Sequence, residues 1–494
     1  MSRFAVDPAH AIAPFVLGLD VGSGGTRAAL YDATGREVAG HRHKVPHAFT
    51  TAADGTSTLD ADQVCEELRT AIGAVLDGTE APVAAIGIDT FASSLVVVDD
   101  TGRALSPCIT YADTRCRAHV ATLRAQLDAA ALHQRTGARI AASYLAPRLR
   151  WLREDQPDIA RRAARFMALG EYAALRLLGE PALGTASAAW SGMIDRRTGE
   201  YVPELLQATD TETAELGRPR DPSDTLPLAD SPLAREFPQL VGAMWVPVVG
   251  DGLTANLGIG ATGPDTWGIS TATSGAIRRL VEGNVDRLPE GLWAYRVDQR
   301  RTLVGSAMSD AGRMLDWAGT RLAIPEDIAH TDTTALLSAP VSDATPLVVP
   351  FLSGERGTRW RDGARAVFAG ISASTTAEDL LRGSLEGLAL SYLRIADQLE
   401  LVGGAPQRIV LSGGMTENVP AWLHLLADAL QKPIDHVAIS RSTMRGAALL
   451  ALEQVAPDVP IAEVPVRETV EPVAAHGEYY RERLARFEAL ADVA

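Results

Sequence analysis

The chain has 494 residues, of which 46% are hydrophobic and 22% are charged, and its formal net charge is −16. This length predicts about two to four domains, and the composition is that of an ordinary globular protein. The acidic balance argues against nucleic acid as a partner, because nucleic-acid binding depends on Lys and Arg side chains that neutralise phosphates.

The N-terminus and the cysteines favour a cytoplasmic protein. Residues 1–14 predict a loose extension and no signal peptide, because Asp7 and Pro8 interrupt the apolar run that such a peptide needs. No run of about 18 uncharged apolar residues occurs, so no membrane span is predicted. The three cysteines form no CxxC pair, which favours free thiols in a reducing compartment over a disulfide framework or a zinc site.

A glycine-dense turn between two apolar strands is predicted within Phe15–Asp32. Gly22, Gly24 and Gly25 lack a Cβ atom, so their backbone N–H groups can approach an anion and form a concave anion site. Asp20 ends the first strand, where a carboxylate is placed to hold a metal ion or its waters. Together these features favour a grip on the phosphates of a metal-bound nucleotide, with a plain β-hairpin as the alternative.

The scarcity of lysine narrows the ways in which phosphate can be bound. Lys44 and Lys432 are the only lysines, and neither lies in a GxxxxGK[ST] context. A Walker-type P-loop is therefore absent, and a lysine Schiff-base mechanism is disfavoured. Phosphate binding must rely on backbone N–H groups, arginine, hydroxyls and metal.

The opening pattern returns in the second half of the chain. Between the two copies, the sequence predicts a helix over Asp60–Leu76 and two strands within Val83–Gly102. Residues 265–283 then predict a second strand, small-residue turn and strand, because GISTATSGAIRRL echoes GLDVGSGGTRAAL. Two such loops can grip a nucleotide from opposite sides. Gln407–Met415 predicts a strand that delivers a Gly pair to a helix start, where a nucleotide can lie beyond the strand end.

Taken together, these motifs resemble those of the FGGY carbohydrate kinases, members of the actin–hexokinase–Hsp70 superfamily. DVGSGGTRA is similar to the first phosphate motif, TYADTR to the substrate segment, VGDG to the segment with the catalytic aspartate, and TATSGA to the second phosphate motif. LSGGM and RGAALLAL are similar to the adenosine-side motifs. The resemblance covers nearly the whole chain after residue 14. Within the family it is strongest to gluconokinases, through GDGLTANLG, TSGAIRRL, GLWAYR and FLSGERGTRWRDGAR.

The resemblance implies an α/β fold of two ribonuclease H-like domains around a nucleotide cleft. The expected divisions are an extension at 1–14, an N-terminal domain at 15–245 and a C-terminal domain at 246–494. The implied enzyme is a carbohydrate kinase, a phosphotransferase with an alcohol acceptor, which uses ATP and Mg²⁺. No nucleic acid or membrane partner is expected, and a homodimer is left open.

The implied substrate is a small sugar or sugar acid that is phosphorylated at a terminal hydroxyl, with gluconate as the leading candidate. The alternative is a kinase for a ketopentose such as xylulose, or for another C4–C6 sugar, polyol or sugar acid. A non-kinase ATPase of the same superfamily ranks below these, and a sugar-binding regulator ranks last.

Two aspartates are expected to have the central roles. Asp251 lies in a Gly-Asp-Gly turn after an apolar strand, and the resemblance makes it the general base, with a helix cap as the alternative. Asp20 is expected to bind Mg²⁺ directly or through water, with a turn residue as the alternative. The residues implied in nucleotide binding are Gly22, Ser23, Gly24, Gly25, Thr26, Arg27, Thr273, Ser274, Gly275, Gly413, Gly414 and Asn418. Those implied in substrate binding are Ser93, Asp113, Arg115, Tyr144 and Asp251.

Several implied roles have a structural alternative. Asp113 and Arg115 could instead form a surface ion pair, and Tyr144 and Arg148 could serve helix packing and solvation. Gly413 and Gly414 suit a tight strand-to-helix turn in either case. The residues Glu355, Arg356 and Arg365 are interpreted as structural ion pairing and are given no catalytic role.

The departures from the gluconokinase pattern concentrate on the substrate side. Ser93 and Ala141 stand where gluconokinases usually carry His, and Ala92 replaces an aromatic residue or Met. Asp89 occupies a position that is usually small or hydroxylated. On the nucleotide side, Arg27 replaces a common lysine and Ala272 a usual glycine. Polar pocket groups discriminate between hydroxylated ligands, so the loss of two His weakens the case for gluconate.

Overall fold

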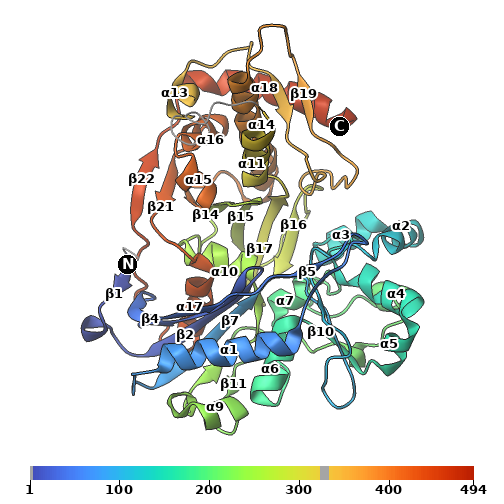
Figure 1. Ribbon diagram of the computed structural model, residues 1–494, viewed down its shortest axis with the longest axis vertical. Helices are drawn as coiled ribbons and strands as arrows, with labels where there is room; N and C mark the ends of the chain where they lie inside the picture. Colours follow the sequence, from blue (N-terminus) through green and yellow to red (C-terminus); the bar gives the residue numbers. More distant parts are fainter. Residues whose placement is uncertain (1–3, 323–332) are drawn as a thin grey trace.

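The computed structural model describes residues 4–322 and 333–494 and contains two large sheets, one above the other in Figure 1. The first sheet has the strand order β1-β4-β3-β2-β7-β12-β11, and β13 also pairs with β7. Its strands are β1 (Ala5–Val6), β2 (Phe15–Gly22), β3 (Gly25–Tyr31), β4 (Glu37–Val45), β7 (Val83–Thr90), β11 (Leu226–Pro227), β12 (Met244–Trp245) and β13 (Val249–Gly250).

The second sheet repeats the central pattern of the first. It has the order β16-β17-β15-β14-β20-β21-β22. In each sheet an antiparallel hairpin, β2–β3 or β14–β15, pairs in parallel with a third strand, β7 or β20. The repeated hairpin predicted from the sequence is therefore confirmed. The strands are β14 (Thr266–Thr271), β15 (Gly275–Glu282), β16 (Trp293–Arg296), β17 (Arg301–Met308), β20 (Arg408–Ser412), β21 (Ile434–Val437) and β22 (Val466–Val470).

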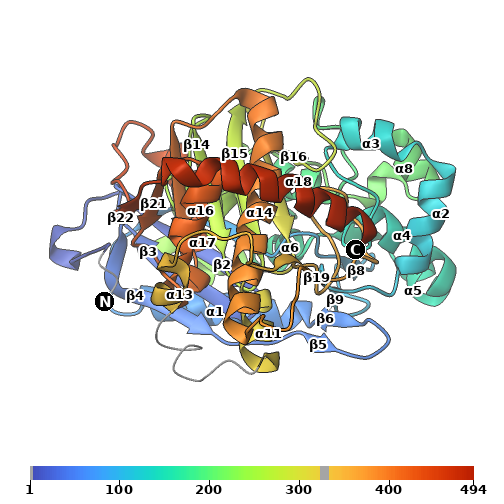
Figure 2. The same ribbon diagram turned by 90° about the horizontal axis from the view of Figure 1, so that it is seen from above.

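Helices cover both sheets. Helix α1 (Ala61–Leu76) begins after Asp60, whose side chain accepts hydrogen bonds from two backbone N–H groups, and its apolar stripe packs beneath β3 and β4. Helix α14 (Ala377–Gly403) begins at the Thr376 capping box and packs on the second sheet. Helix α18 (Gly477–Val493) crosses α14 and α16 (Trp422–Leu430) in Figure 2 and buries Tyr480 and Phe487.

The remaining elements are short or lateral. Helices α2 (Arg117–Gln126), α3 (Ala129–Thr136), α4 (Leu145–Asp155) and α5 (Pro157–Arg162) lie to one side of the first sheet in Figure 1. Further α-helices and strands are α6 (Leu169–Leu178), α7 (Thr185–Trp190), α8 (Pro203–Ala208), α9 (Pro232–Glu236), α11 (Gly312–Arg321), α13 (Thr333–Ser338), α15 (Gly414–Asn418), β5 (Thr50–Thr51), β6 (Ser57–Leu59), β8 (Val96–Val98), β9 (Cys108–Ile109), β10 (Arg165–Met167), β18 (Leu347–Val349) and β19 (Val367–Ala369).

Helices α10 (Asp251–Gly258) and α17 (Ser442–Val455) lie at the junction of the two sheets (Figure 1). They cross so closely that a Cβ atom on Gly446 would lie 1.9 Å from the carbonyl oxygen of Thr254. One on Gly258 would lie 1.8 Å from that of Ser442. Helix α17 also packs against β7, where a Cβ atom on Gly87 would lie 1.9 Å from the Ala447 oxygen. Only glycine permits such backbone contacts.

The N-terminal segment differs from the predicted loose extension. Within its described part, residues 4–14, β1 pairs in parallel with β4, and Phe4 is buried against Val410 and Val437 of the second half. An apolar side chain at position 4 gains more by covering this edge than by remaining in water. Residues 1–3 lie outside the described part.

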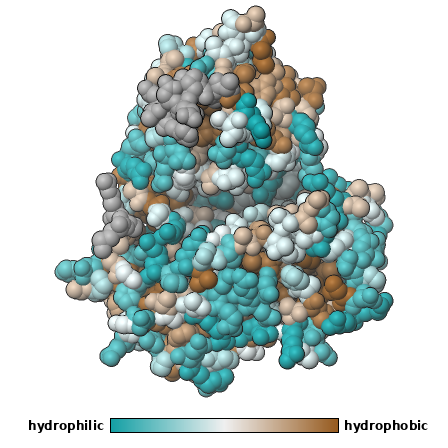
Figure 3. Space-filling view, in the orientation of Figure 1, coloured by the Kyte–Doolittle hydropathy of each residue, from teal (hydrophilic) through white to brown (hydrophobic). Residues whose placement is uncertain are grey.

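The surface in Figure 3 is indented between its upper and lower parts, and the lower part is predominantly hydrophilic. The three cysteines are buried and free. Among the described helices, none is long and apolar enough to cross a membrane.

The expected division between the two domains, at residues 245/246, falls between β12 and β13. Both strands pair with β7, and the position of the boundary stays a proposal.

Candidate active site

Buried hydrogen bonds among His47, Glu67 and Thr26 support the first hairpin turn. His47 contacts the Gly22 carbonyl oxygen through Nε2, at 2.8 Å, and Glu67 through Nδ1, at 2.6 Å. The Thr26 hydroxyl donates to the same Glu67 carboxylate at 2.7 Å. Thr26 is therefore directed into the protein and supports the turn from below. By contrast, Ser23 and Gly24 are exposed at the tip, and a Cβ atom on Gly24 would meet nothing within 4 Å.

Asp20 lies beside this turn and is tied to both halves of the chain. Its Oδ2 accepts a hydrogen bond from Arg27 Nη1 at 2.7 Å across the hairpin. The same oxygen accepts one from the Thr443 hydroxyl, at the start of α17, at 3.0 Å. No hydrogen bond from a described residue reaches Oδ1. In the described residues, no group of three or more His, Cys, Asp or Glu side chains is arranged as a metal site.

The second hairpin turn, between β14 and β15, is exposed. Ala272, Thr273 and Ser274 are exposed, and the Thr273 carbonyl oxygen accepts hydrogen bonds from the Ala311 and Arg313 N–H groups at 3.1 and 3.2 Å. Gly275 lies so near Tyr392 that a Cβ atom would be 2.3 Å from its hydroxyl. The turn is therefore fixed by the segment that leads into α11 and by α14.

A third glycine turn lies next to the second hairpin. Gly413 has φ 144°, and a Cβ atom on it would lie 2.0 Å from the Thr271 carbonyl oxygen. Glycine is required here both by the backbone conformation and by the close approach of β20 to β14. Gly414 and Asn418, at the two ends of the short helix α15, are exposed.

Asp251 begins α10, directly after β13. The two flanking glycines give room for Trp190, since a Cβ atom on Gly252 would lie 2.7 Å from its ring and one on Gly250 would lie 3.1 Å from it. Position 251 thus combines a strand end, a helix N-terminus and an aromatic support. A carboxylate at a helix N-terminus is favoured by the backbone N–H groups there.

The charge of Asp251 is balanced by few groups. Burial raises the pKa of Asp251 to about 6, the positive charge of Arg278 opposes this rise, and the negative charge of Asp20 adds to it. Arg278 Nη1 donates to the Ser270 hydroxyl at 3.2 Å, while its Nε has no hydrogen-bond partner among the described residues. A carboxylate with this pKa is close to the range that suits a general base near neutral pH.

Aromatic rings from both halves of the chain meet beside Asp251. Trp190 stacks on Tyr295 with ring centroids 4.2 Å apart, and Tyr295 stacks on Trp293 at 4.6 Å. The hydroxyls of Tyr144 and Tyr295 are 2.5 Å apart. Tyr144, a predicted substrate residue, is therefore buried in this cluster, which joins it to β16 of the second sheet.

Ser93 lies next to this aromatic cluster, and its backbone has a left-handed conformation with φ 57°. Its hydroxyl donates to the Trp190 carbonyl oxygen at 3.3 Å. Its own carbonyl oxygen accepts a hydrogen bond from Arg148, which also donates to Thr110 at 2.8 Å. Because Arg148 is 1% exposed, the solvated arginine of the structural alternative is wrong, and its hydrogen bonds hold the two loops together instead.

Asp113 and Arg115 pair with each other. Arg115 Nη2 lies 2.7 Å from Asp113 Oδ2, and its guanidinium lies 4.6 Å from the centroid of the Trp151 ring. Asp113 Oδ2 also accepts the Ser57 N–H at 2.9 Å. The structure does not join this pair to Asp251 by a hydrogen bond or ion pair within the described residues, so a contact with substrate remains a prediction.

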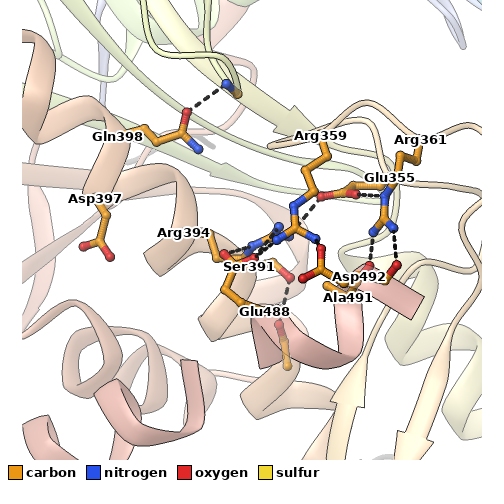
Figure 4. Close-up of polar contacts among 12 residues, drawn as sticks. Glu355, Arg359, Arg361, Ser391, Arg394, Asp397, Gln398, Glu488, Ala491 and Asp492 are labelled. Atoms are coloured by element: carbon orange, nitrogen blue, oxygen red, sulfur yellow. Dashed lines mark hydrogen bonds and ion pairs between the residues drawn. The ribbon is translucent and has the colours of Figure 1, made fainter. Parts of the chain in front are cut away.

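The interpretation of the Glu355 region as structural ion pairing is right for Glu355 only. Its buried carboxylate pairs with Arg361 at 3.0 Å and with Arg394 at 3.1 Å, and Arg394 reaches Glu488 of α18 (Figure 4). Arg356, the next residue, is exposed and has no ion pair or side-chain hydrogen bond among the described residues. The network therefore fixes the backbone on which Arg356 stands.

The charge of Arg356 acts on two groups of the site. Burial raises the pKa of Tyr111, the charge of Asp251 raises it further, and the charge of Arg356 lowers it. Arg356 also opposes the rise in the pKa of Asp251. Tyr111, Asp251 and Arg356 thus act on one another at one place, to which three segments of the chain contribute.

Sequence reasoning missed Trp190, Arg278, Arg356 and Thr443 as members of this site. Arg278 is part of the TSGAIRRL segment. The alternation of side chains along a strand does not distinguish a residue that faces the site from one that faces the core. Arg356 stood in a charged run whose partners became known only in three dimensions. The sequence held one signal for Trp190: the two glycines that flank Asp251 leave room for a bulky side chain.

Comparison with known proteins covers both halves of the chain. The family model described as "FGGY family of carbohydrate kinases, N-terminal domain" matches residues 15–258, and the C-terminal domain of the same family matches residues 279–454. A gluconokinase of Bacillus subtilis (strain 168) is 23% identical over an alignment of 461 residues that covers 89% of this chain and 87% of the relative. A xylulose kinase of Escherichia coli (strain K12) is 27% identical over an alignment of 434 residues that covers 85% of this chain and 86% of the relative.

The fold is shared with solved structures. The crystal structure of gluconate kinase from Lactobacillus acidophilus superposes with a TM-score of 0.89 at 20% identity and covers 97% of this chain and 98% of that one. The predicted two-domain α/β fold is thereby confirmed. The chain belongs to the FGGY family of carbohydrate kinases, enzymes that transfer a phosphoryl group from ATP to an alcohol group of their substrate.

Proposed function

We propose that this kinase phosphorylates a terminal hydroxyl of gluconate, with Asp251 as the general base. The observation that supports this most is the partly buried Asp251 carboxylate at the start of α10, whose pKa lies at about 6. Asp251 accepts the proton of the terminal hydroxyl, the oxygen attacks the γ-phosphorus in line, and ADP leaves. A ketopentose such as xylulose, or another small sugar, polyol or sugar acid, is the second candidate.

The two hairpin turns suit the phosphates of ATP. Both turns are exposed and offer backbone N–H groups, one at Ser23 and Gly24 and the other at Ala272–Ser274. The adenosine would lie next to the third glycine turn, at Gly413. The free Oδ1 of Asp20 fits a Mg²⁺ ion, which proteins usually hold through one or two carboxylates and substrate phosphates. Mg²⁺ would offset the charge that the phosphates bring.

An anionic substrate is supported by the arginines around Asp251. Arg356 is exposed and has no partner among the described residues, while Arg278 is kept beside Asp251. A guanidinium binds a carboxylate through two parallel hydrogen bonds. The gluconate carboxylate would lie against Arg356, and its carbon chain would lie along the aromatic wall at Trp190. A coupled ADP-release assay with gluconate, xylulose, glycerol and related acids tests this choice; turnover of xylulose but not gluconate would favour the second candidate.

Loss of the Arg356 charge is expected to slow the phosphorylation of acidic substrates only. Arg356→Gln should lower kcat/KM for gluconate by about ten- to hundredfold, because a hydrogen bond to a charged group is lost. Turnover of neutral sugars should change little. Arg359→Gln is the matched control, since Arg359 lies in the same loop but pairs with Glu488 at 2.7 Å. Equal losses in both variants, or for acids and neutral sugars alike, would contradict an anion-binding role.

The acid limb of the pH profile is expected to follow Asp251. Its pKa is raised to about 6, so the base is ionised above this pH and protonated below it. Consequently kcat/KM should fall as pH decreases through about 6, higher than an ordinary aspartate would give. Steady-state rates between pH 5 and 8 measure this directly. A profile that stays flat down to pH 5 would argue against Asp251 as the base.

A further inference from the structure

Asp89 is a carboxylate to which the proposed reaction assigns no role. It lies in β7, the central strand of the first sheet, and is fully buried, with 0% exposure. Its register partners are Asp20 on β2 and Val249 on β13, all in parallel strands. Residues in register on parallel strands direct their side chains to the same face. Asp20 and Asp89 are therefore side by side, and Asp251 follows two residues after Val249.

Neither oxygen of the Asp89 carboxylate has a hydrogen-bond partner among the described residues. The neighbouring Thr254 hydroxyl donates instead to the Asp251 carbonyl oxygen at 3.0 Å. A buried carboxylate without partners is costly, so it needs either a proton or a cation.

The surroundings provide too little positive charge for three carboxylates. Arg27 is paired with Asp20 Oδ2, and Arg278 is the cation that acts most strongly on Asp251. Neither donates a hydrogen bond to Asp89. The free Oδ1 of Asp20 and the two free oxygens of Asp89 come from adjacent strands, about 4.8 Å apart. At this spacing, two carboxylates can each give one oxygen to the same octahedral ion.

We propose that Asp89 is a second protein ligand for the divalent cation, which it shares with Asp20. This rests on the proposed magnesium role of Asp20 and extends it to the neighbouring strand β7. With ligands from two strands, the ion is held by the protein as well as by the nucleotide phosphates. The expected consequence is tighter binding of the metal in the presence of ADP than a single carboxylate gives.

The test is Mn²⁺ binding to the full chain with ADP and without sugar, followed by the EPR signal of free Mn²⁺. Asp89→Asn should raise the dissociation constant of Mn²⁺ by at least about tenfold, while ADP affinity without metal stays as in the wild type. Glu171→Gln is the matched control. Glu171 is also buried, with an unpartnered Oε1, and burial raises its pKa to about 7, yet it lies outside the nucleotide site. Its Mn²⁺ affinity should remain that of the wild type.

Two results would overturn the proposal. One is Mn²⁺ affinity in Asp89→Asn within about twofold of the wild type; the other is an equal loss in Glu171→Gln. Asp20→Asn separates this failure from that of the proposed function: if only Asp20→Asn loses Mn²⁺, Asp20 is a ligand and Asp89 is not. Should Asp89→Asn fold poorly, Asp89→Ser gives the same comparison with a small hydroxylated residue. Thermal unfolding with and without Mg²⁺ and ADP is the second readout, and Asp89→Asn should lose most of the metal-dependent rise in Tm.

Discussion

Replacing Asp251 with asparagine is expected to lower kcat by about 10²- to 10⁴-fold, the range that general-base catalysis contributes. The amide has almost the shape of the carboxylate but cannot accept the proton of the substrate hydroxyl. ADP binding should remain close to that of the wild type, because the hairpin turns at Ser23 and Thr273 are unaltered. Single-turnover rates and calorimetric ADP titrations measure the two effects separately.

The same variant has an expected stability signature. Because the pKa of Asp251 is raised in the folded protein, ionisation of the carboxyl destabilises the fold as pH rises through about 6, and this cost is absent below the unfolded pKa. Asp251→Asn removes this dependence, so its stability relative to the wild type should be greater at pH 7 than at pH 4. Near-wild-type kcat in Asp251→Asn would refute the assignment, and a parallel loss of ADP binding would indicate a damaged site.

A large loss of stability is expected from Gly446→Ala. Its Cβ atom would lie 1.9 Å from the carbonyl oxygen and 2.5 Å from the carbonyl carbon of Thr254, so α10 and α17 must move apart. We expect the free energy of unfolding to fall by about 3 kcal/mol, as for severe overpacking, and kcat to fall because Asp251 starts the displaced helix. Urea unfolding and steady-state kinetics measure these effects.

Gly319→Ala is the control for this substitution. Gly319 is also helical, in α11, but a Cβ atom on it would meet nothing within 4 Å. Alanine there should leave kcat unchanged and stabilise the protein by up to about 1 kcal/mol, through helix propensity. If Gly446→Ala were as stable as Gly319→Ala, the tight crossing of the two helices would not exist in solution.

Local signals made much of the fold predictable. The turns at Gly22 and Thr273 are bounded by apolar strands, and the register of each hairpin follows from a few neighbouring residues. The cap at Thr376 and the apolar face that follows it define α14 in the same way. Asp251 could be singled out because a strand end and two glycines lie next to it in sequence.

What could not be predicted depends on contacts between distant residues. Thr443 and Asp20 are 423 positions apart, and nothing near either one indicates the other. Glu355 and Arg356 have the same local context, yet only the position of Arg394 and Glu488 decides that one is paired and the other free. Phe4 looked like part of a loose segment because the apolar edge that it covers is formed by residues after position 258.

The crossing of α10 and α17 also has a consequence for altering this enzyme by directed evolution. Gly258 and Gly446 leave no room for a side chain. The position of Asp251, at the start of α10, depends on this close crossing. Ser93, by contrast, contacts Trp190 at the aromatic cluster that the substrate is expected to meet. Random libraries limited to such positions can therefore explore new acceptors without loss of the transfer chemistry, whereas libraries that include the crossing would consist largely of inactive clones.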